Sequence, residues 1–228
     1  MTTLLLVRHG LTAQTGPVLT GRTPGVHLDE RGREQVTALG GRLAAVPVAA
    51  IVSSRLERCV ETAEGLAVGR DVAVTLDERL DECGYGEWTG QELKTLAKDP
   101  LWRQVQAHPS AVTFPGGEAM RDIAARAVVV VRHWNSTLGD AATWIAVSHG
   151  DVIKAIVADA LGLHLDQFQR VHVDPASLTV IRYTELRPFV VRLNDTGGSV
   201  GDLVPPKRGR RRKPSSDAAP GGGAGSAG

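Results

Sequence analysis

The fold of this chain is decided by a stretch near its start, Leu4-Leu5-Leu6-Val7-Arg8-His9-Gly10. An apolar run that stops at a polar pair and a glycine is typical of a buried strand. A second stretch has the same form, because the apolar run 143–147 ends at Ser148-His149-Gly150. Strands buried on both faces belong to parallel sheets that helices cover on each side. The two stretches therefore predict an α/β domain.

Helix and strand patterns alternate along the rest of the chain. Asp29 is a good N-cap, and Val36, Leu39 and Leu43 recur after it at helical spacing. This alternation predicts a three-layer α/β/α sandwich with a mainly parallel central sheet. The expected strands are 4–7, 48–52, 72–76, 143–147, 178–183 and 189–193; besides the helix after Asp29, the expected helices are 56–68, 92–105 with a break at Pro100, 118–138 and 151–161.

The 228 residues suit one domain, and the pattern dissolves after Asn194 into glycine, serine, proline and basic residues. We therefore expect a domain over 1–194 and a disordered, basic and Gly-rich C-terminal tail over 195–228. Six of the basic residues lie after Val204, and the chain up to that residue has 20 basic and 24 acidic residues. Any anion site in the domain must then be local. Without aromatic residues among its charges, the tail is expected to bind neither nucleic acid nor a membrane surface.

The sequence also bears on where the protein works. No apolar run approaches the roughly 20 residues that span a bilayer, and the N-terminus lacks the pattern of a signal peptide. A cytoplasmic location without a membrane partner is the expectation. Cys59 and Cys83 are too few for a zinc motif or a disulfide framework. They fit a reducing compartment, and we interpret them as apolar fillers rather than as a redox pair.

His9 and His149 are the strongest chemical signals. Each follows an expected strand at its carboxyl end, where ligands bind in open α/β sheets. Arg8 can hold an anion beside His9, and Gly150 opens an expected helix whose first N–H groups suit phosphate. A single turn of this kind is explained by a histidine that caps a strand. Two of them in one chain predict a phosphate site.

Two further segments carry groups that suit phosphate chemistry. Segment 53–63 opens a helix, and its Arg55 and Arg58 are three residues apart, so both are expected on one helix face, where guanidinium groups can bind phosphate. Pairing with neighbouring glutamates at the surface is the alternative. Segment 80–90 places Glu82 in a loop of glycines and aromatic residues. A carboxyl group placed there can act as a general acid.

In their order and composition, these segments resemble the histidine phosphatase, or phosphoglycerate mutase-like, superfamily. The resemblance covers almost everything up to Leu193, and a further segment, 114–118, resembles one common in the phosphatase branch. The segments that carry it are Arg8-His9-Gly10, 53–63, Glu82-x-x-Tyr85-Gly86-x-Trp88-x-Gly90 and Ser148-His149-Gly150.

The resemblance implies a role for each matching residue. His9 would be the nucleophile that forms a phosphohistidine, and Arg8, Arg58 and His149 would complete the phosphate pocket. Glu82 would protonate the leaving group and then activate water. Two arginines and a histidine can stabilise the charge of the transition state. No metal or other cofactor is therefore expected.

The loop 12–28 departs from the family pattern. Many members have Glu-Thr after the first motif and then an Asn that touches phosphate, whereas this chain has Leu11-Thr12, and Thr15 falls near the Asn. Thr20-Gly21 matches a small-residue–Gly pair that often approaches the phosphate. We expect Thr15, Thr20, Gly21 and Gly150 to help bind phosphate. Arg22 replaces the usual aromatic residue of the mutases, and it either binds a further substrate anion or is a solvated loop charge.

The family contains phosphatases and mutases. Glycolytic mutases carry an adjacent arginine pair before the Gly-Gly-Glu segment, and this chain has only Arg103 there, in a short stretch. A mutase must keep water from the phosphohistidine, which a short lid does poorly. The sequence therefore favours a phosphatase of small phosphorylated metabolites, with a phosphomutase as the alternative. Specificity is expected in regions 12–28 and 88–115, and the oligomeric state is left open.

Two other classes of protein compete with this interpretation. A metal hydrolase could use His9, His27 and His149 as ligands, but Arg8 and Arg58 would then place positive charge beside the cation, and no zinc-ligand spacing is present. A non-catalytic protein that binds phosphorylated ligands is the other. Every proposed catalytic position is filled, which favours an enzyme.

Overall fold

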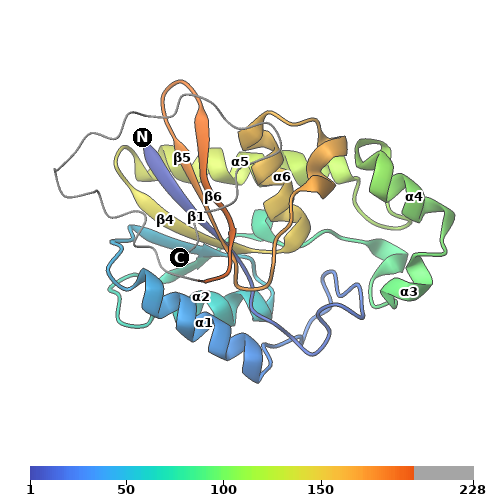
Figure 1. The fold of residues 1–228 in the computed structure, drawn as a ribbon, viewed down its shortest axis with the longest axis horizontal. Helices are drawn as coiled ribbons and strands as arrows, with labels where there is room; N and C mark the ends of the chain where they lie inside the picture. Colours follow the sequence, from blue (N-terminus) through green and yellow to red (C-terminus); the bar gives the residue numbers. More distant parts are fainter. Residues whose placement is uncertain (198–228) are drawn as a thin grey trace, which may run out of the picture. The chain divides into compact units, whose positions relative to one another are not determined.

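The computed structural model describes residues 1–197, which form a mixed sheet of six strands in the order β3-β2-β4-β1-β5-β6 (Figure 1). The first four strands in this order run parallel, and β5 runs antiparallel to both β1 and β6. The mainly parallel sheet is confirmed. The strands are β1 (Thr2–Arg8), β2 (Ala50–Ser53), β3 (Val74–Leu76), β4 (Thr143–Ser148), β5 (Leu178–Tyr183) and β6 (Pro188–Asp195).

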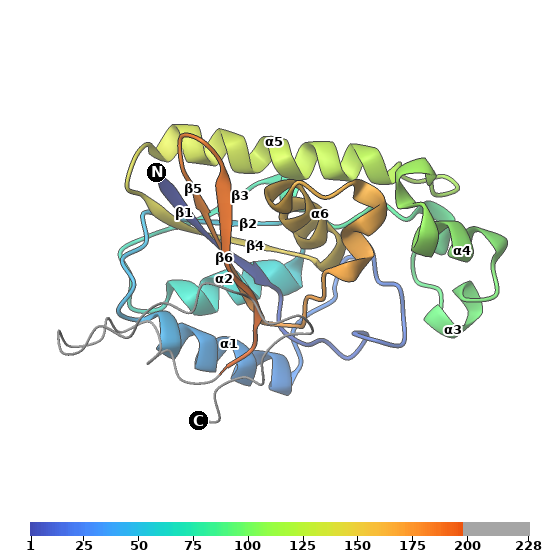
Figure 2. The same cartoon turned by 45° about the horizontal axis from the view of Figure 1, so that its top comes forward.

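Helices cover both faces of this sheet, as Figure 2 shows. On one face lie α1 (Glu30–Leu43) and α2 (Glu57–Ala67), and on the other α5 (Met120–Leu138) and α6 (Gly150–Leu161). The side chains of β1 alternate between these layers: Leu5 and Val7 pack into the cluster with α1 and α2, and Leu4 and Leu6 pack into the cluster with α5 and α6. The three-layer α/β/α fold is thus confirmed.

Local sequence signals fix several helix ends. Asp29 caps α1, because its Oδ1 accepts a hydrogen bond of 2.8 Å from the amide of Gly32. Gly162 ends α6 in the left-handed conformation, with φ of 67°. Pro100 starts a helix, where its missing N–H costs nothing. The stretch expected as a helix broken at Pro100 is therefore two short helices, α3 (Leu93–Leu96) and α4 (Pro100–Ala107).

Short 3₁₀ turns join the larger elements near the carboxyl ends of the parallel strands. The last of these turns, η4, packs against α6. Helices α3 and α4 stand beyond the edge of the layers at the same end (Figure 1). These segments can therefore form walls over the strand ends. The turns are η1 (Glu78–Leu80), η2 (Gly86–Trp88), η3 (Pro109–Ala111) and η4 (Leu165–Arg170).

The last strand extends one residue beyond the expected domain boundary. β6 ends at Asp195, whose two carboxylate oxygens accept hydrogen bonds of 2.8 and 2.7 Å from Arg42 Nη2 in α1. This ion pair ties the end of the sheet to the helical layer. The rest of the predicted tail, from residue 198 on, lies outside the described residues. Within residues 1–197, none of the helices has the length and apolarity needed to cross a membrane.

Candidate active site

The pairing of β1 with β4 brings the two histidine motifs together. Arg8 lies opposite Ser148 in the parallel register, so the next residue of each strand leaves the sheet at the same place. The amide of His9 donates to the carbonyl of Ser148 at 3.0 Å. The imidazole rings of His9 and His149 lie 5.2 Å apart between centroids. The two motifs, distant in the chain, thus form one site.

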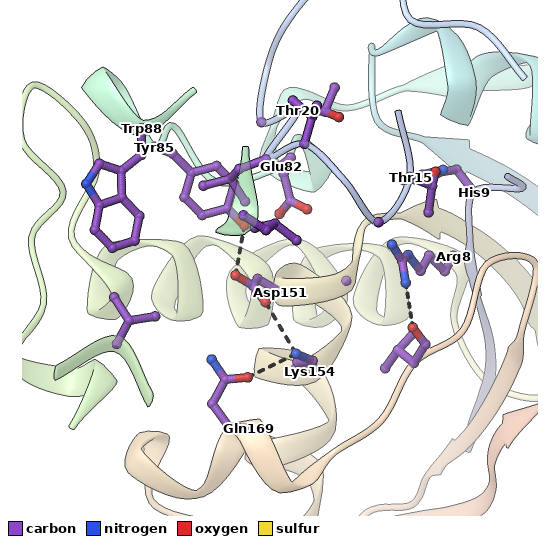
Figure 3. A pocket seen from close by; sticks show the side chains of 18 of the residues that line it. Arg8, His9, Thr15, Thr20, Glu82, Tyr85, Trp88, Asp151, Lys154 and Gln169 are labelled. Carbon is purple, nitrogen blue, oxygen red and sulfur yellow. Dashed lines mark hydrogen bonds and ion pairs between the residues drawn. The ribbon is translucent and has the colours of Figure 1, made fainter. Parts of the chain in front are cut away.

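A cavity of about 410 Å³ opens at this end of the sheet. It is lined by eight of the nine residues that the sequence predicts for the site, and Figure 3 shows several of them facing the same space. The exception is His149, which lies behind this wall. The eight lining residues are Arg8, His9, Thr15, Thr20, Gly21, Arg58, Glu82 and Gly150.

His9 is held in a nucleophilic form. Its Nδ1 lies 2.7 Å from the carbonyl oxygen of Gly10, so Nδ1 carries the proton and donates it. The lone pair is then on Nε2. Burial, together with the positive charges of Arg58 and Arg8, keeps the pKa of His9 well below its ordinary value. The imidazole is therefore neutral near pH 7 and can attack an electrophile.

The glycine after His9 is required by packing. A Cβ atom at Gly10 would lie 2.8 Å from the carbonyl oxygen of Gly32, in the first turn of α1. The amide of Gly10 also donates to Thr62 Oγ1 in α2 at 3.2 Å. Both helices of this layer thus fix the backbone that carries the nucleophile.

Two arginines leave donors unused beside His9. Arg8 Nη1 donates to the carbonyl of Val173 at 2.7 Å, and Arg58 Nη2 donates to the carbonyl of Gly21, also at 2.7 Å. Arg8 Nε and Arg58 Nη1 are buried without a hydrogen-bond partner among the described residues. Buried unpaired donors are rare in folded proteins. Positive groups of this kind suit an anion with several oxygens.

His149 supports Arg58 from behind. Its Nδ1 accepts from Arg58 Nη2 at 3.2 Å, and its Nε2 lies 2.9 Å from Ser54 Oγ, which in turn donates to Asp81. Burial, with Arg58 next in effect, lowers the pKa of His149 well below its ordinary value. The neutral ring therefore orients the guanidinium group. Direct contact of His149 with phosphate stays a prediction.

Arg55 does not join Arg58, contrary to the expectation of a shared helix face. α2 begins only at Glu57, so Arg55 lies before the helix. Its Nε and Nη2 donate to Asp81 Oδ2 at 2.9 and 2.7 Å, and its Nη1 pairs with Glu78. Asp81 is buried and captures this guanidinium outside the cavity. Arg55 therefore has a structural task.

Glu82 lines the cavity from the loop that follows η1. Its Oε1 accepts a hydrogen bond of 2.9 Å from the amide of Cys83. Burial, followed by the negative charge of Asp151, raises the pKa of Glu82 to about 7, although the Cys83 amide and Arg58 favour its charged form. A carboxyl group with this pKa is protonated in a large share of molecules at neutral pH. It can donate a proton and take one back.

The segment around Glu82 packs backbone to backbone against residues 115–117. A Cβ atom at Gly117 would lie 2.2 Å from the carbonyl oxygen of Gly84, and one at Gly86 would lie 2.0 Å from that of Pro115. Gly84 also binds Glu118 twice, through its carbonyl to the Glu118 amide and through its own amide to Glu118 Oε2, each at 2.7 Å. The Gly-Gly-Glu segment thus serves to place the loop that carries the acid.

Arg22 takes neither of the two roles that the sequence allows. Its Nε donates to the backbone carbonyl of Glu82 at 2.7 Å, and its Nη2 donates to Glu118 Oε2 at 2.8 Å. Arg22 is absent from the lining of the cavity, so it does not face a substrate anion. It joins the loop before α1 to the Glu82 segment.

The two threonines of this loop differ. Thr15 Oγ1 accepts from the amide of Thr12 at 3.1 Å and lies 2.9 Å from Thr12 Oγ1, so it is bound within the loop. Thr20 Oγ1 makes only a long contact of 3.4 Å with Gln14. The Thr20 hydroxyl is thus freer to meet a ligand.

Sequence reasoning missed a polar part of the wall. Asp151, Lys154 and Gln169 line the cavity from α6 and η4, and His172 follows them. Asp151 and Lys154 are three residues apart in the first turns of a helix that starts at the phosphate motif. That spacing puts both on the face toward the site. It is the signal by which they could have been found.

The cysteines are buried next to the site. Cys59 Sγ lies 3.3 Å from His149 Nε2, and burial raises the pKa of both Cys59 and Cys83 well above the ordinary value. Neutral thiols of this kind pack as small apolar groups. Among residues 1–197, no three histidine, cysteine, aspartate or glutamate side chains gather as a metal site would require.

Comparison with known proteins agrees with the geometry. A sequence model of the histidine phosphatase superfamily (branch 1) matches residues 4–196. Phosphoserine phosphatase 1 of Hydrogenobacter thermophilus is 32% identical, over 86% of this chain and 93% of its own length. Glucosyl-3-phosphoglycerate phosphatase of Mycolicibacterium vanbaalenii is 32% identical, over 72% of this chain and 76% of its own.

A solved structure gives the same result. Bacillus stearothermophilus YhfR superposes with a TM-score of 0.79 at 32% identity, covering 86% of this chain and 98% of that one. The resemblance read from the motifs is therefore confirmed, and the activity that these relatives support is that of a phosphatase. This chain belongs to the histidine phosphatase superfamily.

Proposed function

We propose that this protein hydrolyses phosphate monoesters of small metabolites through a covalent phosphohistidine on His9. One observation carries the proposal: His9 offers Nε2 beside two arginines whose buried donors have no partner among residues 1–197. A phosphoryl group supplies the oxygens that these donors lack. Its phosphorus can then lie next to the nucleophile.

The reaction has two steps. In the first, Nε2 of His9 attacks phosphorus, the P–O bond to the alcohol breaks, and protonated Glu82 gives its proton to the leaving oxygen. In the second, the Glu82 carboxylate takes a proton from water, which attacks the phosphohistidine and releases inorganic phosphate. Arg8 and Arg58 stabilise the charge that spreads over the equatorial oxygens in both steps.

Hydrolysis suits this cavity better than mutase chemistry does. The lid region contributes Leu93, Trp102, Val105 and Gln106 to the wall, none of which is charged, and Arg103 is not among the lining residues. A mutase must retain a second phosphorylated ligand beside the phosphohistidine. This lid brings no cation for that purpose. A phosphomutase remains the alternative activity.

The remaining expectations belong to the same proposal. Two relatives are named for phosphoserine and for glucosyl-3-phosphoglycerate, which supports a small phosphorylated metabolite as the substrate. We place the protein in the cytoplasm, without a metal or other cofactor and without a nucleic-acid partner. The guanidinium groups supply the positive charge that a metal provides in other phosphatases.

The test is phosphate release from a panel of phosphate monoesters, with and without chelator. We expect release that survives chelator and is lost in His9→Ala, with acid-labile ³²P on the wild-type protein after a quench. Full activity in His9→Ala would overturn the mechanism. Interconversion of phosphoglycerates after priming with bisphosphoglycerate, without phosphate release, would establish the mutase instead.

A further inference from the structure

The wall of the cavity opposite the lid holds a row of polar side chains that the proposed reaction does not use. Figure 3 shows Asp151, Lys154 and Gln169 side by side at the edge of the cavity, with Tyr85 on the far side of Asp151. The side chains of Lys154 and Asp151 are each about four-fifths buried, with exposures of 21% and 20%. Their position is therefore fixed by packing.

The oxygens of Asp151 and Gln169 in this row each have a donor as neighbour. Asp151 Oδ2 accepts from the Tyr85 hydroxyl at 2.8 Å, and Asp151 Oδ1 lies 3.6 Å from Lys154 Nζ. Lys154 Nζ donates to Gln169 Oε1 at 3.0 Å. Burial raises the pKa of Tyr85 well above its ordinary value, so its hydroxyl keeps the proton that it donates. Each of the three oxygens thus already faces one donor.

Donors remain in the same row. An ammonium group has three protons, and Lys154 has two oxygen partners, Gln169 and Asp151, while its Nζ also lies 5.6 Å from the centre of the Phe168 ring. The Gln169 amide nitrogen carries two more and makes no hydrogen bond with the described part of the chain. The N–H donors that remain belong to an ammonium group and to an amide, and Asp151 is the counter-charge of the ammonium group. N–H donors on and beside an ammonium group suit an anionic oxygen.

The other walls do not compete for such a group. The lid side is mostly apolar, with Trp88, Leu93, Trp102 and Phe114, and its one polar side chain, Gln106, is uncharged. Arg8 and Arg58 are matched by the two negative charges of the phosphoryl group. Lys154 is the one lysine or arginine besides Arg8 and Arg58 among the residues that line the cavity, so a further negative charge on the substrate binds best beside it.

We propose that Lys154 and Gln169 form a subsite for a carboxylate on the leaving alcohol, so that the preferred substrates are phosphate monoesters of small hydroxy acids. The inference rests on the proposed phosphatase activity and names its substrate class. Lys154 is then the residue that determines specificity, and Asp151 holds it in position. The apolar lid covers the carbon skeleton between the two anionic ends.

Two substrate pairs isolate the carboxylate. 3-Phosphoglycerate differs from glycerol 3-phosphate, and O-phosphoserine from O-phosphoethanolamine, chiefly in that group. We expect Lys154→Met to lower kcat/KM for each acid about 10- to 100-fold, as the loss of one charge-assisted hydrogen bond predicts. The value of kcat/KM for the substrate without the carboxylate should change less than about threefold. Gln169→Leu should act in the same direction with a smaller effect.

The ratio within a pair is the measured quantity, because any effect of Lys154→Met on Glu82 or on folding is common to both members. Lys94→Met is the matched control, since Lys94 is 81% exposed and does not line the cavity. Equal losses for acid and neutral partner, or no preference of the wild type for either acid, would overturn the subsite.

Binding separates this inference from the proposed function. His9→Ala cannot turn over, so calorimetric titration of 3-phosphoglycerate and glycerol 3-phosphate into it reads the subsite alone. We expect the acid to bind more tightly and to lose that advantage in His9→Ala/Lys154→Met. If the acid loses its tighter binding in the double variant but the wild type releases no phosphate, the proposed phosphatase activity is overturned and the anion subsite stands. If 3-phosphoglycerate and glycerol 3-phosphate bind His9→Ala equally well, only the subsite is overturned.

Discussion

The backbone carbonyl of Glu82 accepts a hydrogen bond of 2.7 Å from Arg22 Nε, which ties the loop before α1 to the proposed acid. Arg126 in α5 donates to the same carbonyl at 3.1 Å. Both arginines also bind Glu118 Oε2, at 2.8 and 3.1 Å. Glu82 is therefore positioned by a loop and a helix that themselves lie outside the phosphate pocket.

Replacing Arg22 by methionine tests this positioning. We expect kcat to fall about 10-fold and KM to change less than about threefold, because a displaced acid impairs the chemistry and leaves the phosphate contacts intact. Steady-state kinetics on one substrate measures both. Arg103→Met is the control, since Arg103 does not line the cavity and lies on the exposed lid.

A double-mutant cycle separates positioning from a general structural effect. Once Glu82→Gln has removed the acid, a residue that acts only through Glu82 has nothing left to align. Arg22→Met in that background should then cost little further activity. Fully additive losses would mean that Arg22 supports the site by another route.

The pH dependence of kcat/KM reports the protonation of Glu82 in the free enzyme. With the pKa of this carboxyl near 7, the acid form that the first step needs is lost as the pH rises, so kcat/KM should drop roughly tenfold per unit above that value. The pKa of His9 lies well below its ordinary value, so the nucleophile stays neutral over this range.

Glu82→Gln supplies the matched comparison, because its amide does not titrate. The ratio of wild type to variant cancels the ionisation of the substrate, whose phosphate has a pKa of about 6. Measured from about pH 5.5 to 9, this ratio should fall through neutrality as the wild type loses its acid. A ratio independent of pH would contradict the role of Glu82 as the proton donor.

The same carboxyl should cost the folded protein stability. Its pKa is about 7 in the fold and near 4.5 when exposed, so the folded state holds the proton more tightly between these values. The free energy of unfolding therefore decreases as the pH rises through that window, and the loss is complete above it. Glu82→Gln removes the charge and should raise the free energy of unfolding by roughly 1–3 kcal/mol at alkaline pH.

Urea denaturation at about pH 8 and pH 4 measures this difference, which should vanish at the acidic value, where both states are protonated. Equal stabilities of wild type and variant at both pH values would show that Glu82 is better solvated than its position indicates. The buried acid would then not lower the free energy of unfolding.

The sequence was sufficient for the parts of the site that depend on short-range order. Arg8, His9 and Gly150 follow or flank buried strands, and the parallel pairing of β1 and β4 needs only those two apolar runs. Arg58 also follows from a strand-to-helix turn. These positions are fixed by elements that their own neighbours specify.

Long-range contacts account for what the sequence left out. The sequence leaves Arg55 between phosphate binding and a surface ion pair, because its partner, Asp81, comes 26 residues later and is recognisable only in the fold. Gln169 meets Lys154 because η4 packs on α6, and no periodic pattern encodes that contact. Lys154 is one of the few charged residues in the mostly buried helix α6. A charged residue among apolar ones in this helix could have indicated its role, but composition alone does not show it.

The cavity unites segments that are packed very differently. The phosphate-binding part of the wall follows the inner strands β1 and β4 and is held by glycines that contact backbone. The part that faces the leaving alcohol comes from 91–114 and η4 at the periphery. Substitutions at the periphery can therefore change the substrate specificity while the residues of the phosphate pocket keep their chemistry. Exchanging 91–114 between two relatives should change which carbon skeleton is preferred and leave the nucleophile and the contact with Lys154 untouched.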